Sequence, residues 1–401
     1  MAGEKFSKDQ VQVAAAVEDV NGTAETLTSA DVEVRFLPDG TDFVYEPDRT
    51  ENNEAGDDLA AAPECVVGRP CTVELATQVQ TSGAVATKPA LGRYLIGCGH
   101  VEEQVKSIAI GAPAGGDNAI LVGETYDVGG GTKTGLIAVS LGGAGTLLYV
   151  PQVGGDLEDL DVLTIGTDGD TATASGASAA YGWRYRPRSA GFKALTLQRA
   201  MRNDKDTAAL DALDRARGCM GSMVLNWESK TASRWSATYR GVKIASVDGD
   251  RFDVVLPAAT CVSLVKLVNA TIQLNSVAIR PQAITFTQNA EVDLLDDPTT
   301  TGGIEGYESA DIARRAPTLA VNPFRVPHSE LDIESLMELG TLVPFVVICG
   351  TTAGDILEFV SPNNQVISSG NEERSRKEVR AIELQPKRGS FLDHDYWFLF
   401  R

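Results

Sequence analysis

The residues able to do chemistry are few and scattered along this chain. His100, His328 and His394 lie far apart, and none has a carboxylate or second histidine at a spacing that would form a metal-binding face. The six cysteines include no C-x-x-C pair. We therefore expect no metal, no cofactor and no catalytic residue, and we expect His100 to be a surface or helix-capping histidine rather than a base.

Two glycine-rich segments invite comparison with ligand-binding loops. GGGTKTG at 129–135 departs from a phosphate loop because Lys133 lacks the preceding glycine and its flanks are strand-like rather than strand-to-helix. TDGDT at 167–171 offers too few oxygen ligands at the spacing of an EF-hand. The chain has no G-x-S-x-G motif, so a hydrolase remains an alternative only if its active site has no linear motif.

The composition favours an assembled protein over a nucleic-acid or membrane binder. With 55 acidic and 35 basic residues among 401, the net charge is −20, so the chain as a whole should repel nucleic acid and anionic membranes. We expect protein partners, no signal peptide and no membrane span. An apolar content of 43% supports real cores in two or three domains.

The segment from Cys71 to Gly99 contains the clearest local pattern. Its first part alternates as a strand does, with one apolar face made of Cys71, Val73, Leu75 and Val79. After a Gly/Ser/Thr turn, Pro89 suits a first helical turn and Gly99 a left-handed C-cap. Between them, helical spacing links Leu91, Tyr94, Leu95 and Cys98.

This pattern resembles the "strand, GxG, then P-A-L/Y-G-x-L-L-x-A-C-G" signature of siphophage major tail tube proteins. Downstream, YRPRSAGFKALTLQRAMRN and RGCMGSMVLNWESKTASRWSATYRGV are similar to the family's run of strand, polar loop, "GxxGtv" strand and aromatic strand. The part from about Thr271 to Arg401 is again similar to the family's second half. Residues 107–180 look inserted, and the loop from Asn203 to Arg217 is longer than the resemblance leads us to expect.

The resemblance implies a mainly β chain with tail-tube-like β-sandwich or barrel domains, each flanked by a short helix. We expect an N-terminal arm, a first tube-like domain in two pieces, an inserted small β domain and a second tube-like domain. These correspond to residues 1–30, 31–106 with 181–262, 107–180, and 263–401. In the family, subunits form rings with a continuous inner β surface, and the rings stack into a hollow tube that conducts DNA.

The order of elements around PALGRYLIGCG recurs around ELDIESLMELG, which ends at Gly340. We therefore expect two tube-like units per chain and trimeric rings with pseudo-sixfold symmetry. The bore should be acidic or neutral and pass viral DNA without sequence-specific binding. The resemblance further implies tape measure, terminator and tail-tip partners, synthesis in the host cytoplasm and a place in the virion tail.

Stacking of the rings is assigned to polar segments that cannot order themselves. Between Asp39 and Glu64, nine acidic residues accompany only Arg49, which predicts an exposed loop. We expect this loop and the N-terminal arm to make axial contacts, with an arginine-rich stretch as a candidate partner surface. The candidate inter-subunit residues are Asp42, Glu46, Asp48, Glu51, Glu54, Asp57, Asp58, Arg184, Arg186 and Arg188.

Three further expectations concern other parts of the chain. The inserted region, acidic and rich in Gly and Thr, should lie outside the tube and be dispensable for assembly. Helical spacing of Ala209, Leu210, Leu213 and Ala216 predicts a short helix before Gly218. The aromatic residues after His394 should pack as a terminal strand. The competing interpretation is a β-rich adhesion or carbohydrate-binding protein that uses exposed Trp183, Trp227 and Trp235.

Overall fold

The computed structural model describes residues 6–50, 64–116, 119–139, 141–142, 145–166, 169–203, 211–254, 256, 264–297, 306–374, 376–389 and 393–401. The fold is mainly β, as the sequence predicts, with 60% of the residues in strands and 6% in helices. Within the described ranges, no helix has the length and apolar character needed to cross a membrane.

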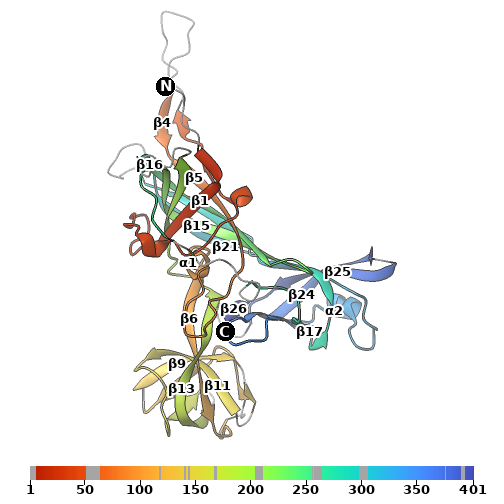
Figure 1. Cartoon of the computed structure of the whole chain (residues 1–401). Coiled ribbons are helices and arrows are strands. Elements are labelled where there is room, and N and C mark those ends of the chain that lie inside the picture. The colour runs from red at the N-terminus through yellow and green to blue at the C-terminus, as the bar shows by residue number, and fades with distance from the viewer. Residues whose placement is uncertain are drawn as a thin grey trace, which may run out of the picture.

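The strands and helices follow one another as shown in Figure 1. The strands are β1 Phe6–Val17, β2 Asp42–Tyr45, β3 Asp48–Thr50, β4 Cys65–Gly68, β5 Pro70–Gln78, β6 His100–Ile110, β7 Ala119–Ile120, β8 Thr125–Val128, β9 Lys133–Val139, β10 Leu141–Gly142, β11 Gly145–Val153, β12 Val162–Ile165, β13 Asp170–Pro187, β14 Leu195–Asn203, β15 Asp211–Glu228, β16 Arg234–Gly249, β17 Thr271–Leu274, β18 Val277–Ala278, β19 Pro281–Thr287, β20 Ala290–Asp296, β21 Tyr307–Arg315, β22 Thr318–Pro323, β23 Val343–Cys349, β24 Leu357–Arg374, β25 Lys377–Pro386 and β26 Trp397–Phe400. The α-helices are α1 Gly92–Gly97 and α2 Ile333–Leu339, and the 3₁₀ helices are Ser29–Asp31 and Pro38–Gly40.

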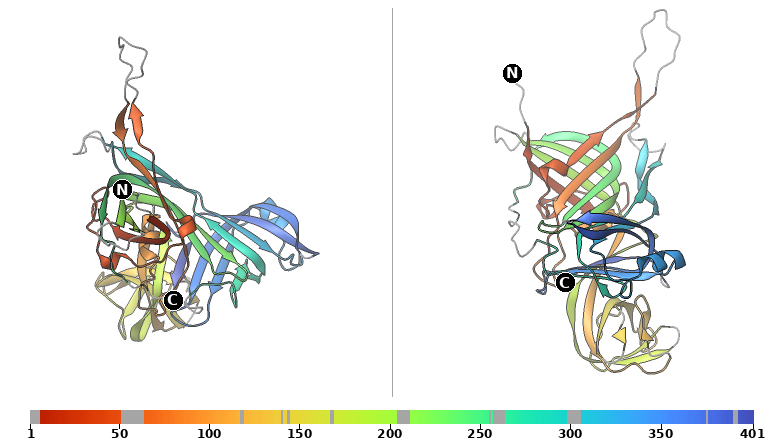
Figure 2. Two further views of the ribbon diagram at one scale, coloured as in Figure 1. Left: turned by 45° about the horizontal axis from the view of Figure 1, so that its top comes forward. Right: turned by 90° about the vertical axis from the view of Figure 1, so that its right-hand side faces the viewer.

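The main sheet is an antiparallel run in the order β2-β5-β16-β15-β19-β22-β25-β24. Its strands alternate between an apolar and a polar face, as in β16, where Trp235 and Tyr239 are buried while Arg234 and Thr238 are exposed. Figure 2 shows how strongly the first-half strands of this sheet curve. The run joins strands from both ends of the chain, and we call it the eight-strand run.

A second layer packs on the apolar face of this run. It has the order β6-β13-β26-β24-β23-β17, with β24 shared between the layers. The first part of β24 pairs with β23 and β26, and its second part pairs with β25. The hydrophobic core between the layers is one cluster that extends from Val13 to Phe400. The two halves of the chain therefore share a core.

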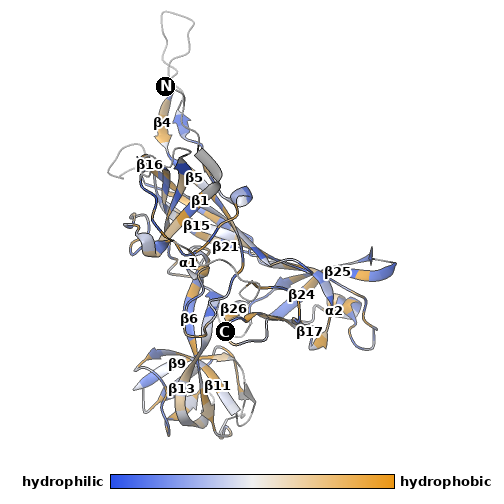
Figure 3. Ribbon diagram, in the orientation of Figure 1, coloured by the Kyte–Doolittle hydropathy of each residue, from blue (hydrophilic) through white to orange (hydrophobic). Residues whose placement is uncertain are grey.

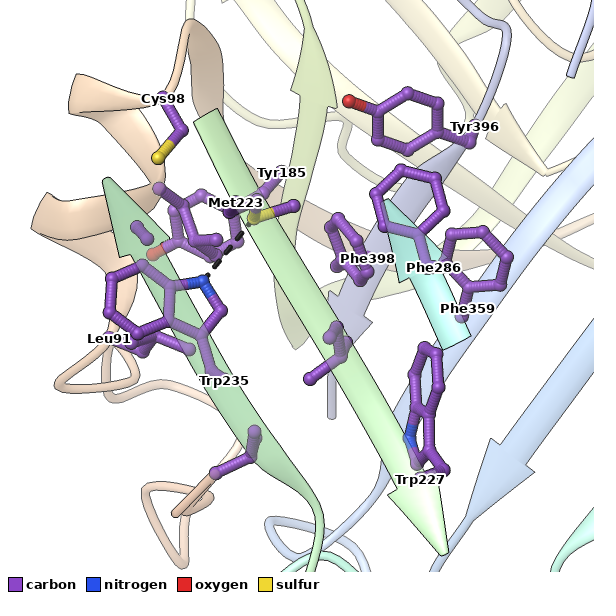
Figure 4. Close-up of a cluster of buried hydrophobic side chains, with 14 of the residues drawn as sticks. Leu91, Cys98, Tyr185, Met223, Trp227, Trp235, Phe286, Phe359, Tyr396 and Phe398 are labelled. Carbon is purple, nitrogen blue, oxygen red and sulfur yellow. Dashed lines mark hydrogen bonds between the residues drawn. The ribbon is translucent and has the colours of Figure 1, made fainter. Parts of the chain in front are cut away.

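Aromatic side chains fill the centre of this core (Figure 4). The ring of Phe359, from β24, lies 5.7 Å from Trp227 of β15, 5.1 Å from Phe286 of β19 and 5.2 Å from Phe398 of β26. The expected terminal strand of aromatic residues is thus present, and all four residues of β26 are buried. Contacts of this kind bury large apolar areas and link the halves directly.

The local pattern between Cys71 and Gly99 folds as predicted. In β5 the residues Cys71, Val73 and Leu75 are buried, and α1 is followed by Gly99 at a φ of +77°. The second helix, α2, likewise ends at Gly340, whose φ is +62°. Both glycines occupy the left-handed region, which a side chain disfavours.

The expected N-terminal arm is in part a strand of the main body. β1 pairs with β14, and its residues Val13 and Ala15 are fully buried in the main core, so this part is ordered within the chain.

Two further local predictions are wrong. The expected helix before Gly218 is instead the start of β15, in which Leu213 and Ala216 pair with β14 and β16. Pairing on both sides outweighs the helical spacing of these residues. Residues 204–210 lie outside the described part. The expected acidic loop is partly strand, because β2 pairs with β5 and β3 pairs with β4.

A second core lies apart from the main one and draws all its members from between Ile108 and Ala174. We call residues 108–174 the small body. In Figure 1 it lies at the lower end of the molecule, where β6 and β13 run into it from the main body. A third cluster, in which Leu148 packs with Trp397 and Leu399, covers the junction.

The shared core predicts that the two halves unfold together. Phe359→Ala removes a fully buried ring and should lower the free energy of unfolding by about 3–5 kcal/mol. Chemical denaturation followed by tryptophan fluorescence should show one transition at lower denaturant. Val162→Ala, at an exposed position, serves as the control. Two separate transitions, only one of them shifted, would contradict a shared core.

Candidate assembly surfaces

Two of the predicted arginines are engaged inside the chain. Arg184 is buried, and its Nη2 lies 2.7 Å from Oε2 of Glu103, while Nη2 of Arg186 lies 2.8 Å from Oε1 of the same carboxylate. Burial alone would raise the pKa of Glu103, but the two guanidinium groups hold it below its ordinary value. This cluster joins β6 to β13 and anchors the base of the small body. Its contacts are internal.

Arg188 is half-buried at the end of β13, and its guanidinium donates to the carbonyl of Gly191. Burial lowers its pKa below the ordinary arginine value. It is the member of the arginine stretch that lies nearest to solvent-exposed chain, because Ser189 and Ala190 follow it. A neighbouring chain would meet this end of the stretch first.

The described acidic candidates also have partners or positions of their own. Oδ1 of Asp42 lies 2.7 Å from Nη1 of Arg199, and Oδ2 of Asp48 accepts from the hydroxyl of Tyr307 at 2.6 Å. Glu46 is exposed between β2 and β3. Glu51, Glu54, Asp57 and Asp58 lie outside the described residues. Among the described candidates, no acidic residue therefore pairs with Arg184, Arg186 or Arg188 within one chain.

The two ends of the eight-strand run are candidate assembly edges. At one end β2 pairs with β5, and at the other the second part of β24 pairs with β25. In the ranges the structure covers, neither segment has a further strand pairing along its outer edge. Such edges present backbone donors and acceptors to a neighbouring chain.

The polar face of the eight-strand run is a candidate lining surface. In the second half it encloses a hollow of about 360 Å³ beside Thr285 and Ala320. Thr, Ser, Asn and Ala predominate on this face, and its charged members include Glu74, Glu372, Glu383, Arg234 and Arg240. The face is therefore polar, with mostly small side chains and charges of both signs.

The chemistry-bearing residues do not converge. His100 is buried rather than exposed; its Nδ1 donates to the carbonyl of Leu95 at 2.9 Å in the last turn of α1, and its Nε2 lies 3.2 Å from the hydroxyl of Tyr396. The capping expectation holds and the surface one is wrong. Burial lowers the pKa of His100 to about 4. Among the described residues, no group of His, Cys, Asp and Glu is arranged to hold a metal ion.

The tryptophans on which the adhesion interpretation depends are not all exposed. Trp227 and Trp235 are fully buried, and the indole nitrogen of Trp235 donates to the sulfur of Met223 at 3.3 Å (Figure 4). Trp183 is half-buried, with the ammonium of Lys88 over its ring at 4.8 Å. That interpretation therefore loses two of its three proposed contact residues.

Sequence reasoning missed Glu103 and the outer edges of β2 and β24. The position of Glu103 in β6, two residues before the apolar Val105 and so on the same face, was a signal, since an inward-facing carboxylate needs a buried partner. No signal in the sequence distinguishes an outer edge from a paired one, because both alternate in the same way. Edges follow from strand order, which depends on contacts between distant residues.

Comparisons with known proteins do not place the chain in a family. No family model matches it, and no curated protein matches it. A functional conclusion therefore depends on the geometry described above and on the sequence pattern.

His100 should make the protein acid-sensitive. The pKa of His100 is lowered in the folded state. Below about pH 6.5 the imidazole is therefore protonated in the unfolded chain, whereas in the folded chain it stays neutral down to about pH 4. The contribution of His100 to the free energy of unfolding is fully present above pH 6.5 and should fall by about 3 kcal/mol by pH 4. Denaturant titrations between pH 7 and 4 should show a shallower fall for His100→Gln. The matched control, His328→Gln at an exposed site, should behave as wild type; equal slopes for both variants would refute the assignment.

Proposed function

We propose that this chain is the major tail tube subunit of a long-tailed phage or a related tail-like particle, with a structural role and no catalysis. Three chains form a ring with pseudo-sixfold symmetry, and stacked rings enclose a channel for DNA. The observation that supports the proposal is the strand order of the eight-strand run, which we interpret as two similar four-strand units joined edge to edge. The sequence resemblance supports the same conclusion independently.

The two units correspond strand by strand. The first has the order β2-β5-β16-β15, and the second has the order β19-β22-β25-β24. A helix follows the second strand of each unit along the chain, α1 after β5 and α2 after β22. Each unit also contains one long hairpin, β15-β16 or β24-β25. We interpret the units as the two predicted tube-like domains and the small body as the inserted domain.

The units join head to tail. Five residue pairs, from Val224↔Thr287 to Glu228↔Ala283, connect the last strand of the first unit to the first strand of the second. Repeating this step between chains would pair β24 of one chain with β2 of the next. Such a heterologous contact forms a ring when its rotation closes, and closure leaves no strand edge open. Three chains supply the six units.

The polar face of the eight-strand run suits the bore. Duplex DNA carries one negative charge per roughly 1.7 Å of helix axis, so a basic lining would retain it. The small neutral side chains of this face, with only scattered charges of both signs such as Glu74 and Arg240, support passage without sequence-specific contacts. The apolar face is occupied by the core and cannot face the channel.

The remaining expectations fit this arrangement as proposals. The small body, on its two-strand support, would lie outside the tube. The part of the N-terminal arm after β1 and the segment carrying Glu51 to Asp58 would contribute to stacking, where several weak ion pairs act together. Tape measure, terminator and tail-tip proteins would meet the ends or the channel. Neither an adhesion role nor a hydrolase gains support from a described contact.

The ring can be tested by cross-linking its proposed junction. In a Cys65→Ser background, Val44→Cys on β2 and Gly370→Cys on β24 should form disulfides between chains but not within one, because the two strands end opposite sides of the run. Ser368→Cys and Glu372→Cys lie on the same face and allow for a shift in register. Mild oxidation should give covalent dimers and trimers, with trimers as the limit.

Negative-stain class averages of the same sample should show rings or tubes with three chains per ring. Val44→Cys combined with Val162→Cys in the small body is the control and should not cross-link. A ring of six whole chains, or a protein that remains monomeric at high concentration, would overturn the proposal.

The proposal that the polar face lines the bore can be tested by adding positive charge to this face. Thr238→Lys with Thr285→Lys adds two ammonium groups per chain to the polar face, one in each unit. Assembled tubes should then retain short duplex DNA at least about ten-fold more tightly at low salt, and lose it at high salt. Thr164→Lys in the small body is the matched control. Equal retention by both would exclude this face as the bore.

A further inference from the structure

An exposed apolar patch lies at the end of α2. Leu339 is 76% exposed, Leu342 46% and Ile367, on β24, 41%. The end of α2 lies close to β24: a Cβ added at Gly340 would be 3.5 Å from Nε2 of Gln365. Ile367 follows two residues later, at the register shift of β24 between Val366 and Ser368. We call Leu339, Leu342 and Ile367 the α2 patch.

The corresponding place in the first unit is covered. Gly99 ends α1 as Gly340 ends α2, and a Cβ there would lie 2.7 Å from Cδ1 of Ile312, on β21. Gly218, at the register shift in β15, faces the backbone of Ser309, also on β21. A small core closes the contact, made of Ala194, Met220, Val292, Ala310 and Ile312. Thus the β20-β21 hairpin of the second unit seals the helix end of the first.

The first unit has a hairpin at the same chain position. The β20-β21 hairpin lies between β19 and β22, and the β3-β4 ribbon lies between β2 and β5. In the second unit the β20-β21 hairpin follows the end of β19, at Thr287. Because β19 runs antiparallel to β15 and Thr287 pairs with Val224, this end of β19 lies toward the beginning of β15. If β2 pairs with a neighbour's β24 in the same antiparallel sense, its Tyr45 end lies toward Val366, beside Ile367.

Resting on the proposed ring, we infer that the β3-β4 ribbon of one chain docks on the α2 patch of the preceding chain. The ribbon would cover the end of α2 in a neighbouring chain, as the β20-β21 hairpin covers the end of α1 within one chain. The occupant of this apolar patch is therefore a second copy of the protein, engaged sideways within the ring.

The ribbon has the surface that such docking requires. On β4, Val66 is 37% exposed and Val67 48%, and Figure 3 shows this strand in orange, away from the cores. The described contacts of the ribbon with the rest of its own chain lie at its base, where Gly68 packs against Tyr307 and the backbone of Val67 lies against Gly306. An isolated two-stranded ribbon is marginal in water, so apolar contact with a neighbour would stabilise it.

Native Cys65 provides a probe, because it is exposed at the start of β4. Leu339→Cys, Leu342→Cys and Ile367→Cys are made one at a time in the otherwise native chain. In assembled rings, mild oxidation should link at least one of them to Cys65 of another chain, at least about ten-fold faster than Val162→Cys. Adding Cys65→Ser should abolish the link.

The product sizes separate the outcomes. Sideways docking closes after three chains, so covalent trimers should be the largest product. Longer covalent products would place the ribbon against a different ring and overturn the inference. Rings that form, and that cross-link between Val44→Cys and Gly370→Cys but never through Cys65, would overturn it while leaving the tube proposal intact. Failure of both cross-links with no rings in micrographs would overturn both.

Discussion

The pairing of β15 with β19 is the contact on which the architecture depends. β15 has two neighbours along one edge, with β14 beside its first part and β19 beside its second. Because strand edges bind through regularly spaced backbone groups, this junction fixes both the register and the direction of the second unit. It also brings Trp227, on β15, opposite Ile284 on β19, and so begins the aromatic core that the halves share.

Sharing of strands continues on the far side of that core. β24 belongs to both layers, and β26 lies between β24 and β13, so the two halves of the chain also meet in the second layer, where β13 pairs with β26. Removing one large side chain from such a core affects both units, since packing at native density leaves no independent boundary. The two proposed units therefore resemble each other in strand order while sharing one hydrophobic core.

The sequence predicted local structure better than contacts between residues far apart in the chain. The buried face of Cys71 and Val73 and the left-handed glycines Gly99 and Gly340 follow from short-range sterics and periodicity, and they are in place. Leu213 was misread because its helical spacing competes with a long hairpin that only tertiary contacts reveal. Arg184 was taken for a surface charge, since its partner Glu103 lies 81 residues away. The candidate surfaces likewise depend on strand order, which residue types do not encode locally.

The paired strands β6 and β13 support the small body and resist bending and twisting. Antiparallel pairing of β6 and β13 extends from His100↔Pro187 to Ile110↔Ala174, with register shifts between Ser175 and Ala179 and between Ala180 and Gly182. Bending or twisting of the paired parts must break backbone hydrogen bonds. A body held in this way has nearly fixed orientation, whereas one on a glycine-rich tether would sample many. Repeated along an assembly, it would present its outer loops as an ordered lattice, and a weak affinity of a single copy for any surface would be multiplied by simultaneous engagement.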